Sequence, residues 1–457
     1  GTAMPTHDRS KAVSFAEAHR RAGFLAFPPR CCPASTTGVG LEPEFFPLRV
    51  DADGNPTMRM ILHDPPRGVL SAVGDLAVND RRLRVGHEAA SGVREFQVDN
   101  GGRITFEPGG QVEHSTCVHS NPSAALDDVD DMSRRLSEAF RARGARLAAV
   151  GMDQWTHVEN IPQQLPGQRY VAQAAYYDRR GRWGAVMMRH TASLQINVDL
   201  GREGIWQERW LTANAVAPIL TAAFACSPTE EGVATRARAW QELDPTRSGF
   251  PRLLLEGSDD PREQWATAAM EADVMLFRSV EGGWGAGEPG FSMGRWIENG
   301  HPEHGWPTVE DFDYHLTTLF LEVRARGFLE LRTGEALPVR WRSVPVIVAC
   351  TLVYDDIARH RFLELISPQV RRLDELWGKA ARVGVRDDEL RGLAERTLEI
   401  VLDRAAELSP DLIAPHHIGP VATFADRYTA RGRMPADRLA ELLAQDPAEA
   451  LEWATAG

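Results

Sequence analysis

Lysine is almost absent from this chain. Only Lys11 and Lys379 occur among the 51 basic residues, which leaves 49 arginines. Both lysines lie outside the polar segments described below, so mechanisms that need a lysine in the active site, such as Schiff-base chemistry or a P-loop, are disfavoured. If the protein handles phosphate, then metal ions, arginine side chains and backbone amides must bind it.

Cysteine pairs, a membrane-spanning run and an excess of positive charge are also missing. The five cysteines include no C-x-x-C pair, which fits free thiols in a reducing cytoplasm better than a disulfide framework. No apolar run is long enough to span a membrane, and the residues before Met4 resemble a cloning scar that no signal peptide follows. The net charge of −13 disfavours nucleic acid or an anionic membrane as the main partner. We therefore expect a cytoplasmic monomer or homodimer with small-molecule partners.

The composition is that of a soluble globular protein. With 457 residues, 43% of them hydrophobic and 25% charged, the chain can bury a sizeable core. We expect the scar and an N-terminal helix at 1–24 and a β-rich catalytic body at 25–345. A helical region at 346–457, with four amphipathic helices after residue 359, is expected to pack on that body. The fold class is therefore α+β.

Alternation of apolar and polar residues predicts a long strand at 186–200. Its polar face carries Gln195, Asn197 and Asp199, and its apolar face is formed by the even-numbered positions. A second strand, FLELR at 328–332, places Glu330 and Arg332 side by side on one face. Charged groups among apolar neighbours are costly to bury, so this pair is not expected by chance.

Two further predicted strands present pairs of carboxylates. Glu42 and Glu44 share a face of the strand at 39–50, and Glu107 and Glu113 flank a tight turn in a hairpin at 104–114. Each pair alone is ordinary for a solvated sheet face. Together they predict one polar basin on a single sheet, where the carboxylates would repel one another unless divalent cations lay between them. Oxygen ligands of this kind are what Mg²⁺ binds.

Other motifs support weaker interpretations. The glycines at 283, 285 and 287 lack the flanking strand and helix of a dinucleotide-binding loop, so 281–290 is expected to be a surface loop. The histidine pairs at 301/304 and 416/417 lie in loops rich in proline or glycine, where a zinc site is a minor alternative. Cys117 lies near His114 and His119, but no acyl-transfer signature accompanies this thiol.

Several of these segments resemble the motifs of a known enzyme family. Six blocks resemble, in family order, the glutamate–cysteine ligases of plants and many bacteria, with the closest likeness to the actinobacterial branch of the ergothioneine pathway. The blocks are GLEPE at 40–44, EPGGQVE at 107–113, TASLQINVD at 191–199, TRARAW at 235–240, DYHLTTLF at 313–320 and FLELR at 328–332.

The resemblance implies a fold and a reaction. The fold would be a glutamine-synthetase-like antiparallel sheet that lines a funnel holding ATP and two or three Mg²⁺ ions, with Mn²⁺ as an alternative. The γ-carboxylate of L-glutamate would attack ATP to give a γ-glutamyl phosphate, and an amine, usually that of L-cysteine, would displace phosphate. Such a reaction needs charge neutralisation and positioning, and no lysine if metals and arginines supply them.

The resemblance also implies roles for individual residues. Mg²⁺ would be bound by Glu42, Glu44, Glu113 and Glu330, with Gln195 or Asn197 near the metal or nucleotide. Arg332 would act with Glu330 in catalysis by steadying the transferred phosphoryl group. The substrate contacts would come from a further set of residues, namely Glu107 on the ammonium, the arginines Arg236, Arg238 and Arg247, and Thr191 and His114.

Two departures from the family pattern concern the substrate. The family usually continues with an apolar residue, Ser and Gly after the third carboxylate, where this chain has His114-Ser115-Thr116. The segment after Arg332 also differs, at 333–338. A different amine or acid substrate in specialised metabolism is therefore the main alternative to cysteine ligation, and a non-catalytic nucleotide- or amino-acid-binding homologue is the remaining one.

Overall fold

A ten-stranded antiparallel sheet forms the centre of the computed structural model, which describes residues 8–29, 36–279 and 281–457. The strands follow the order β13-β14-β8-β1-β6-β5-β4-β3, and β2 and β7 also pair with β1. Their bounds are β1 (Val39–Val50), β2 (Pro56–Arg59), β3 (Leu83–Glu88), β4 (Arg94–Val98), β5 (Arg103–Phe106), β6 (Val112–Ser115), β7 (Ala145–Ala148), β8 (Leu194–Asp199), β13 (Val323–Ala325) and β14 (Phe328–Leu331).

The register of the sheet decides which side chains share a face. Residues directly opposite each other on paired strands project to the same side. Glu42 lies opposite Gln195, Glu44 opposite Glu113, and Asn197 opposite Glu330. The alternate residues of these strands form the buried apolar face, with Leu41, Leu194, Ile196, Val198, Leu329 and Leu331 at most 2% exposed. The predicted polar basin on a single sheet is therefore confirmed.

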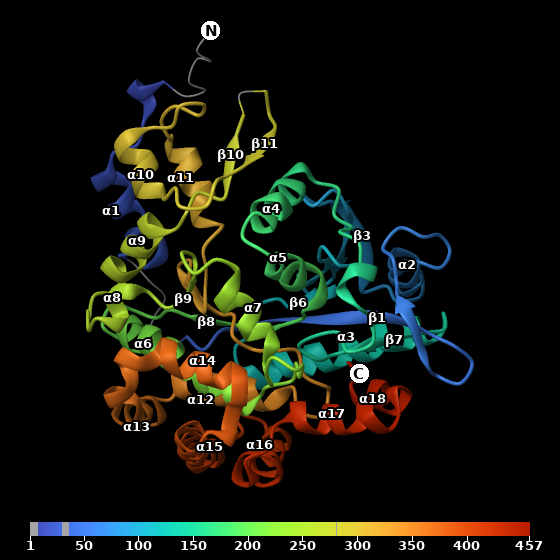
Figure 1. The fold of residues 1–457 in the computed structure, drawn as a ribbon. Helices are drawn as coiled ribbons and strands as arrows, with labels where there is room; N and C mark the ends of the chain where they lie inside the picture. Colours follow the sequence, from blue (N-terminus) through green and yellow to red (C-terminus); the bar gives the residue numbers. More distant parts are fainter. Residues whose placement is uncertain (1–7, 30–35, 280) are drawn as a thin grey trace.

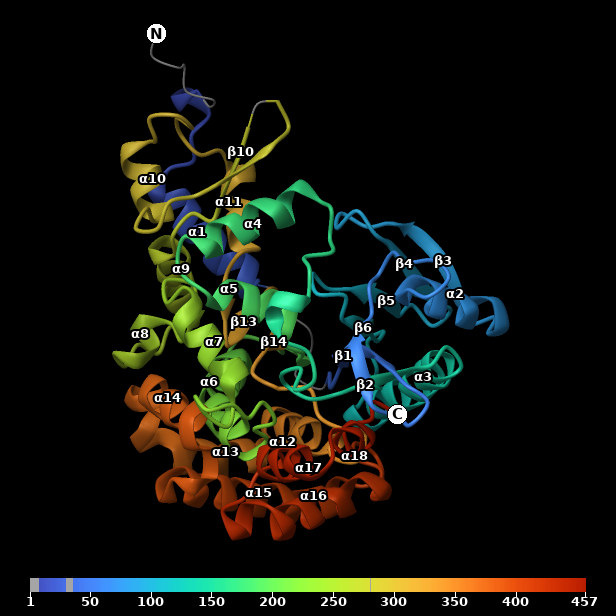
Figure 2. The same cartoon turned by 45° about the vertical axis from the view of Figure 1, so that its right-hand side comes forward.

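Helices surround this sheet, and the α+β fold class is confirmed. In both views the orange-to-red C-terminal helices gather on one side of the molecule, while α1 lies beside α9 at the opposite end (Figures 1 and 2). The last residues return to the sheet, since the amide of Ala456 donates to the carbonyl of Leu147 in β7. No helix among the described residues is long and apolar enough to cross a membrane. The domain division at 345 stays a prediction.

The helix bounds are α1 (Phe15–Ala26), α2 (Val69–Asn79), α3 (Pro122–Arg141), α4 (Gln168–Asp178), α5 (Trp183–Ala185), α6 (Ile205–Ala223), α7 (Thr235–Leu243), α8 (Arg252–Leu255), α9 (Pro261–Glu271), α10 (Met293–Asn299), α11 (Val309–Leu316), α12 (Ser343–Tyr354), α13 (Asp356–Ile366), α14 (Leu373–Val383), α15 (Asp388–Leu408), α16 (Pro415–Arg427), α17 (Pro435–Gln445) and α18 (Pro447–Trp453). Two small sheets pair β10 (Leu276–Arg278) with β11 (Trp284–Ala286), and β12 (Phe320–Leu321) with β9 (Ser248–Gly249).

Three predictions of local structure were wrong. The segment Val186–His190 is a π-helix, so only Leu194–Asp199 of the long predicted strand is a strand. The expected surface loop at 281–290 contains β11, which forms a hairpin with β10. The histidines at 416 and 417 begin helix α16, which was expected to be a loop.

Candidate active site

Three half-buried carboxylates meet at the centre of the polar face. One carboxylate oxygen each from Glu44, Glu107 and Glu113 lies within 4.8 Å of the others. Glu44 and Glu113 come from opposing positions of β1 and β6, and Glu107 follows β5 directly. Burial, reinforced by the charge of Glu44, raises the pKa of Glu107 to about 8. Burial and the neighbouring carboxylates also raise the pKa of Glu113 well above its usual range.

This cluster fits a divalent cation. Ionised carboxylates at such distances repel one another, and the raised pKa values record the cost of holding them together without a counter-charge. The donor set consists of carboxylate oxygens alone, which suits Mg²⁺ or Mn²⁺ better than a soft metal. Glu107, expected to orient a substrate ammonium, therefore lies among the candidate metal ligands.

Glu42 extends the cluster through neutral hydrogen-bond donors. The side-chain amides of Gln195 and Asn197 both donate to Oε2 of Glu42, Asn197 at 3.0 Å. The hydroxyl of Ser115 lies 3.0 Å from Oε1 of Glu42 and 3.3 Å from Oε1 of Glu113. Glu44 is held in a similar way, because the backbone amide of Ser193 donates to its Oε1 at 2.8 Å. These donors fix the carboxylates before any cation binds.

The turn between β5 and β6 explains the EPGGQ sequence. A Cβ atom on Gly109 would lie 2.7 Å from Cα of Arg189, so only glycine fits against the π-helical segment there. Gly110 has a φ of +82°, which disfavours other residues. The side chain of Gln111 donates to the carbonyl of Thr191 at 2.9 Å. The turn is thereby fixed against residues 188–191 and holds Glu107 in the cluster.

Glu330 is neutralised by arginines in this structure. Its Oε2 accepts from Arg324 at 2.5 Å and its Oε1 from Arg326 at 2.9 Å. Burial alone would raise the pKa of Glu330, but the guanidinium groups of Arg324, Arg326 and Arg332 outweigh it and lower that pKa. Both carboxylate oxygens are therefore engaged, and the expected metal-ligand role of Glu330 stays a prediction.

Arg332 is held between two aromatic rings. Its guanidinium lies 4.8 Å from the ring centroids of both Trp240 and Phe320. Burial and the charge of Arg324 lower its pKa to about 10, so it remains a cation near neutral pH. Among the described residues its Nε has no hydrogen-bond partner. A guanidinium held by stacking at the wall of a cavity is suited to binding an incoming phosphate or carboxylate.

Two cavities lie over the polar face. The first, of about 390 Å³, is lined by Glu44, Glu107 and Glu113 together with Gln195, Thr191, Arg236 and Arg332. The second, of about 620 Å³, is lined by Glu42, Asn197, Asp199 and the glycines at 38, 40, 101 and 327. The predicted residues Gln195 and Asn197 therefore line different cavities.

Three predicted substrate contacts lie away from the first cavity. His114 belongs to β6, where alternation turns it to the apolar face opposite Glu113, and it is fully buried. Arg238 lies two positions from Arg236 on α7, about 200° round the helix, and its guanidinium lies 6.0 Å from the ring of Trp183. These two placements do not support substrate contacts.

Arg247 serves the core instead of the cavity. It is 1% exposed and donates to the Oδ2 of Asp244 at 2.7 Å and to the carbonyl of Thr318 at 2.8 Å. Its charge is therefore already compensated inside the protein. The hydrogen bonds explain why an arginine occurs in this segment without a substrate to bind.

Several cavity residues were missed by sequence reasoning. Arg169, Tyr170 and Gln173 reach the first cavity from α4. Arg324 lines the same cavity from β13. The available signal was the spacing of 169, 170 and 173, which matches one face of a helix.

Comparison with known proteins shows the family of this chain. Residues 75–454 match the family model of glutamate–cysteine ligase family 2. Glutamate–cysteine ligase EgtA of Mycolicibacterium smegmatis is 34% identical over 349 residues, 73% of this chain and 79% of that protein. The protein of the same name from Mycobacterium tuberculosis is 30% identical over 355 residues, 74% of this chain and 76% of that protein.

A solved structure and a plant relative extend the comparison. A glutamate–cysteine ligase from Francisella tularensis, crystallised with AMP, has the same fold, with a TM-score of 0.54 at 12% identity over 92% of this chain and 87% of that chain. The chloroplastic glutamate–cysteine ligase B of rice is 26% identical over 81% of this chain and 74% of that protein. The chain belongs to the glutamate–cysteine ligase family 2, a family of ATP-dependent carbon–nitrogen ligases.

Proposed function

We propose that this protein joins the γ-carboxylate of L-glutamate to the amine of L-cysteine at the expense of ATP. One carboxylate oxygen of glutamate attacks the γ-phosphorus, ADP leaves, and a γ-glutamyl phosphate forms. The cysteine amine then attacks the carbonyl carbon of this acyl phosphate, phosphate leaves, and the amine gives up a proton as the amide forms. The single observation that carries the proposal is the cluster of Glu44, Glu107 and Glu113 in the wall of the first cavity.

The two cavities suit different substrates. The larger cavity is bordered by glycines, which allow a flat ring and a ribose to approach the backbone, so we place the nucleotide there. The smaller cavity carries Arg169, Arg236 and Arg332, which suit the carboxylates of an amino acid. The transferred phosphoryl group would then lie between the cavities, above the carboxylate cluster.

The carboxylates supply the cation site, and the arginines act on the substrates. Glu42, Glu44, Glu107 and Glu113 would hold Mg²⁺, which when bound neutralises charge on the phosphate oxygens. Arg332 is positioned by its two aromatic neighbours to stabilise negative charge on the transferred group. Arg236 donates to the carbonyls of Arg332 and Thr333 at 3.1 Å each, and this fixes its guanidinium at the cavity wall.

Cysteine as the acceptor is supported by the apolar part of the first cavity. Met187, Met275, Trp240 and Phe320 line it beside the arginines. Thioether and aromatic side chains make favourable contacts with a thiol, whereas they offer no partner for a charged acceptor side chain.

The test is product formation with a panel of amines. Phosphate release from Mg·ATP is measured with L-glutamate held fixed, and the products are identified by mass spectrometry. We expect release to be fastest with L-cysteine and to yield γ-glutamylcysteine. A faster reaction with another amine would identify that amine as the acceptor in place of cysteine. Absence of phosphate release with every amine would contradict the ligase proposal.

The dependence of the rate on Mg²⁺ concentration distinguishes the role of Glu113 from that of Glu330. We expect Glu113→Gln to raise the Mg²⁺ concentration for half-maximal rate by about tenfold or more, because the variant loses a charged ligand. Glu330→Gln should instead lower kcat with a smaller change in that concentration, because its carboxylate positions Arg324 and Arg326 here. Equal shifts in the Mg²⁺ requirement of both variants would show that Glu330 is a metal ligand in the working enzyme.

A further inference from the structure

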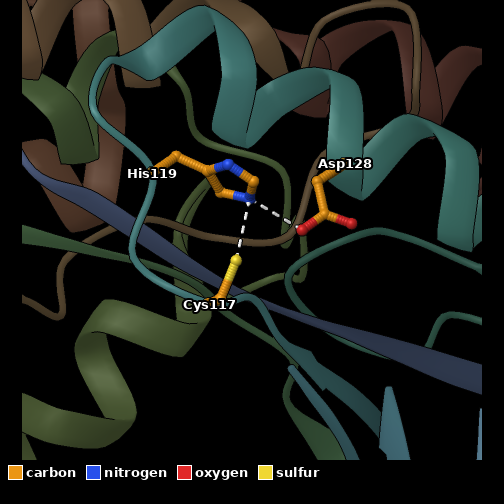
Figure 3. A group of neighbouring side chains, drawn as sticks. All are labelled: Cys117, His119 and Asp128. Atoms are coloured by element: carbon orange, nitrogen blue, oxygen red, sulfur yellow. Dashed lines mark hydrogen bonds and ion pairs between the residues drawn. The ribbon is translucent and has the colours of Figure 1, made fainter. Parts of the chain in front are cut away.

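A second cluster of metal-ligating side chains lies at the edge of the larger cavity. Cys117, His119 and Asp128 each place one ligand atom within 4.8 Å of the other two (Figure 3). Cys117 lines the cavity wall, and the side chains of His119 and Asp128 are 20% and 13% exposed. The ligase mechanism uses none of these three residues, and an ion from solvent can reach them.

One imidazole nitrogen faces both other groups. Nε2 of His119 lies 2.8 Å from Oδ2 of Asp128 and 3.4 Å from Sγ of Cys117, as the dashed lines of Figure 3 mark. This nitrogen has either one hydrogen or one lone pair to offer, so it cannot make two linear hydrogen bonds. The same arrangement is unsuited to a nucleophilic triad, because there the two ring nitrogens divide the thiol and the carboxylate between them.

Two of the three ligand distances are close to those of a tetrahedral metal site. Bonds of about 2.3 Å to sulfur and about 2.0 Å to nitrogen or oxygen place neighbouring ligand atoms about 3.3 to 3.5 Å apart. The sulfur–nitrogen distance of 3.4 Å already meets this requirement. The nitrogen–oxygen distance of 2.8 Å needs only a small outward shift of the Asp128 carboxylate.

The backbone holds the three ligands in place. The amide of His119 donates to the carbonyl of Val39 at 2.9 Å, and the amide of Val39 donates back at 2.8 Å. Thr116 is fastened in the same way to Leu41 of β1. Asp128 belongs to the long helix α3, and the side chain of Asn100 donates to its Oδ2 at 3.2 Å. Orientation by such neighbours is typical of metal sites.

We propose that Cys117, His119 and Asp128 bind a Zn²⁺ ion, with water as the fourth ligand. A thiolate and an imidazole select Zn²⁺ over Mg²⁺, which distinguishes this site from the all-carboxylate cluster. As the sulfur–zinc bond forms, the thiol proton passes to solvent and the imidazole binds through its Nε2 lone pair. The ion links the segment after β6 to α3 beside the second cavity.

The test uses the full chain, reduced and freed of metal, titrated with Co²⁺ as a spectroscopic probe. A thiolate ligand gives a sulfur-to-cobalt charge-transfer band in the near ultraviolet, and Zn²⁺ should displace the Co²⁺ while a large excess of Mg²⁺ should not. We expect Cys117→Ser to abolish the band and to weaken Zn²⁺ binding about 100-fold, since even groups that orient a ligand are worth about 10- to 100-fold.

Matched variants address the rival sites. Cys31 and Cys32 lie outside the described residues, and Asp127, His416 and His417 form a further candidate cluster. The double variant Cys31→Ser/Cys32→Ser and the variant His416→Ala should both keep the band. His119→Asn should lose it, which keeps the proposal testable if Cys117→Ser does not fold. Absence of the band in the parent protein, or its persistence in Cys117→Ser or His119→Asn, would overturn the proposal.

Discussion

The carboxylates of Glu44, Glu107 and Glu113 are costly to hold close together. Each belongs to a different strand or strand end, so the sheet forces together groups that would separate in a flexible chain. Neutral donors such as Ser115 and Ser193 satisfy some of their oxygens. The repulsion that remains destabilises the fold, and a bound cation would relieve it. The protein would thus lose some stability in order to bind a cation.

Glu335, a carboxylate outside the cluster, provides a test of how burial changes a pKa. Glu335 is 3% exposed and accepts hydrogen bonds from the hydroxyl of Ser227 at 2.7 Å and the amide of Cys226 at 2.9 Å. Burial outweighs these bonds and raises its pKa from 4.5 to about 7. Its raised folded-state pKa means that its contribution to stability is complete below pH 4.5 and is lost as the pH rises through 7.

Glu335→Gln should therefore equal the parent protein in stability near pH 4.5 and exceed it at pH 8. The glutamine oxygen can accept from Cys226 and its amide can donate to Ser227, so packing is preserved. The shift from 4.5 to about 7 predicts a gain on the order of 3 kcal/mol in the free energy of unfolding at pH 8. Urea unfolding of both proteins at pH 4.5 and pH 8 measures this gain. A stability difference between variant and parent that is the same at both pH values would contradict the raised pKa of Glu335.

His114 provides the second prediction at this scale. Neither ring nitrogen has a hydrogen-bond partner among the described residues, and burial lowers the pKa of the imidazole to about 4. We expect His114→Leu to stabilise the protein by about 1–3 kcal/mol, because a buried polar group without partners is removed. The relative rates with different amine acceptors should not change. A changed acceptor profile would return His114 to the substrate site.

The sequence alone predicted most carboxylates of the site but few of its arginines. Glu42, Glu44 and Glu113 were predictable because alternation along a strand decides which face a side chain occupies. Arg238 and Arg247 do not line the first cavity, because an arginine beside a motif has no such constraint and a long side chain can turn to an aromatic ring or a buried carboxylate. Only tertiary packing decides between these outcomes.

At the scale of elements, strands with one buried face were predicted well and the segment before β8 was not. Alternation continues through residues 186–190, yet that segment forms a π-helix. Its Arg189 approaches the turn at Gly109, and its Met188 carbonyl accepts from Gln111 at 3.3 Å. This contact joins segments distant in sequence, so no local pattern could reveal it.

Helix α16 was missed because Pro415 and Gly419 resemble loop residues, although proline is favoured in a first helical turn.

Gly109→Ala tests that contact. The new Cβ would lie 2.5 Å from the carbonyl oxygen of Arg189, so the turn that carries Glu107 must shift. We expect a loss of about 1–3 kcal/mol in stability and a drop in ligase activity. The control is Gly74→Ala in α2, where a Cβ meets no atom within 4 Å and helix propensity predicts a gain of about 1 kcal/mol. Equal behaviour of the two variants would contradict the close approach.

For the whole molecule, the sheet is closed on its apolar side by helices distant in sequence. Every residue of α12 is buried, and the amide of Ala149, the residue after β7, donates to the carbonyl of Ala454 near the chain end at 2.7 Å. The C-terminal helices therefore support the strands that carry the glutamates. The α+β fold class was predictable because the sequence shows both the alternation of strands and the periodicity of amphipathic helices. The order of the strands in the sheet depends on long-range pairing, which the sequence does not show.

The most direct test of the central claim follows an oxygen atom. Glutamate labelled with ¹⁸O in its γ-carboxylate is incubated with the protein, Mg·ATP and L-cysteine, and the released phosphate is analysed by mass spectrometry. If the γ-carboxylate attacks ATP, one labelled oxygen must leave with the phosphate when the amide forms, so each product phosphate should carry one ¹⁸O. Phosphate that is released together with γ-glutamylcysteine but carries no label would contradict the acyl-phosphate mechanism.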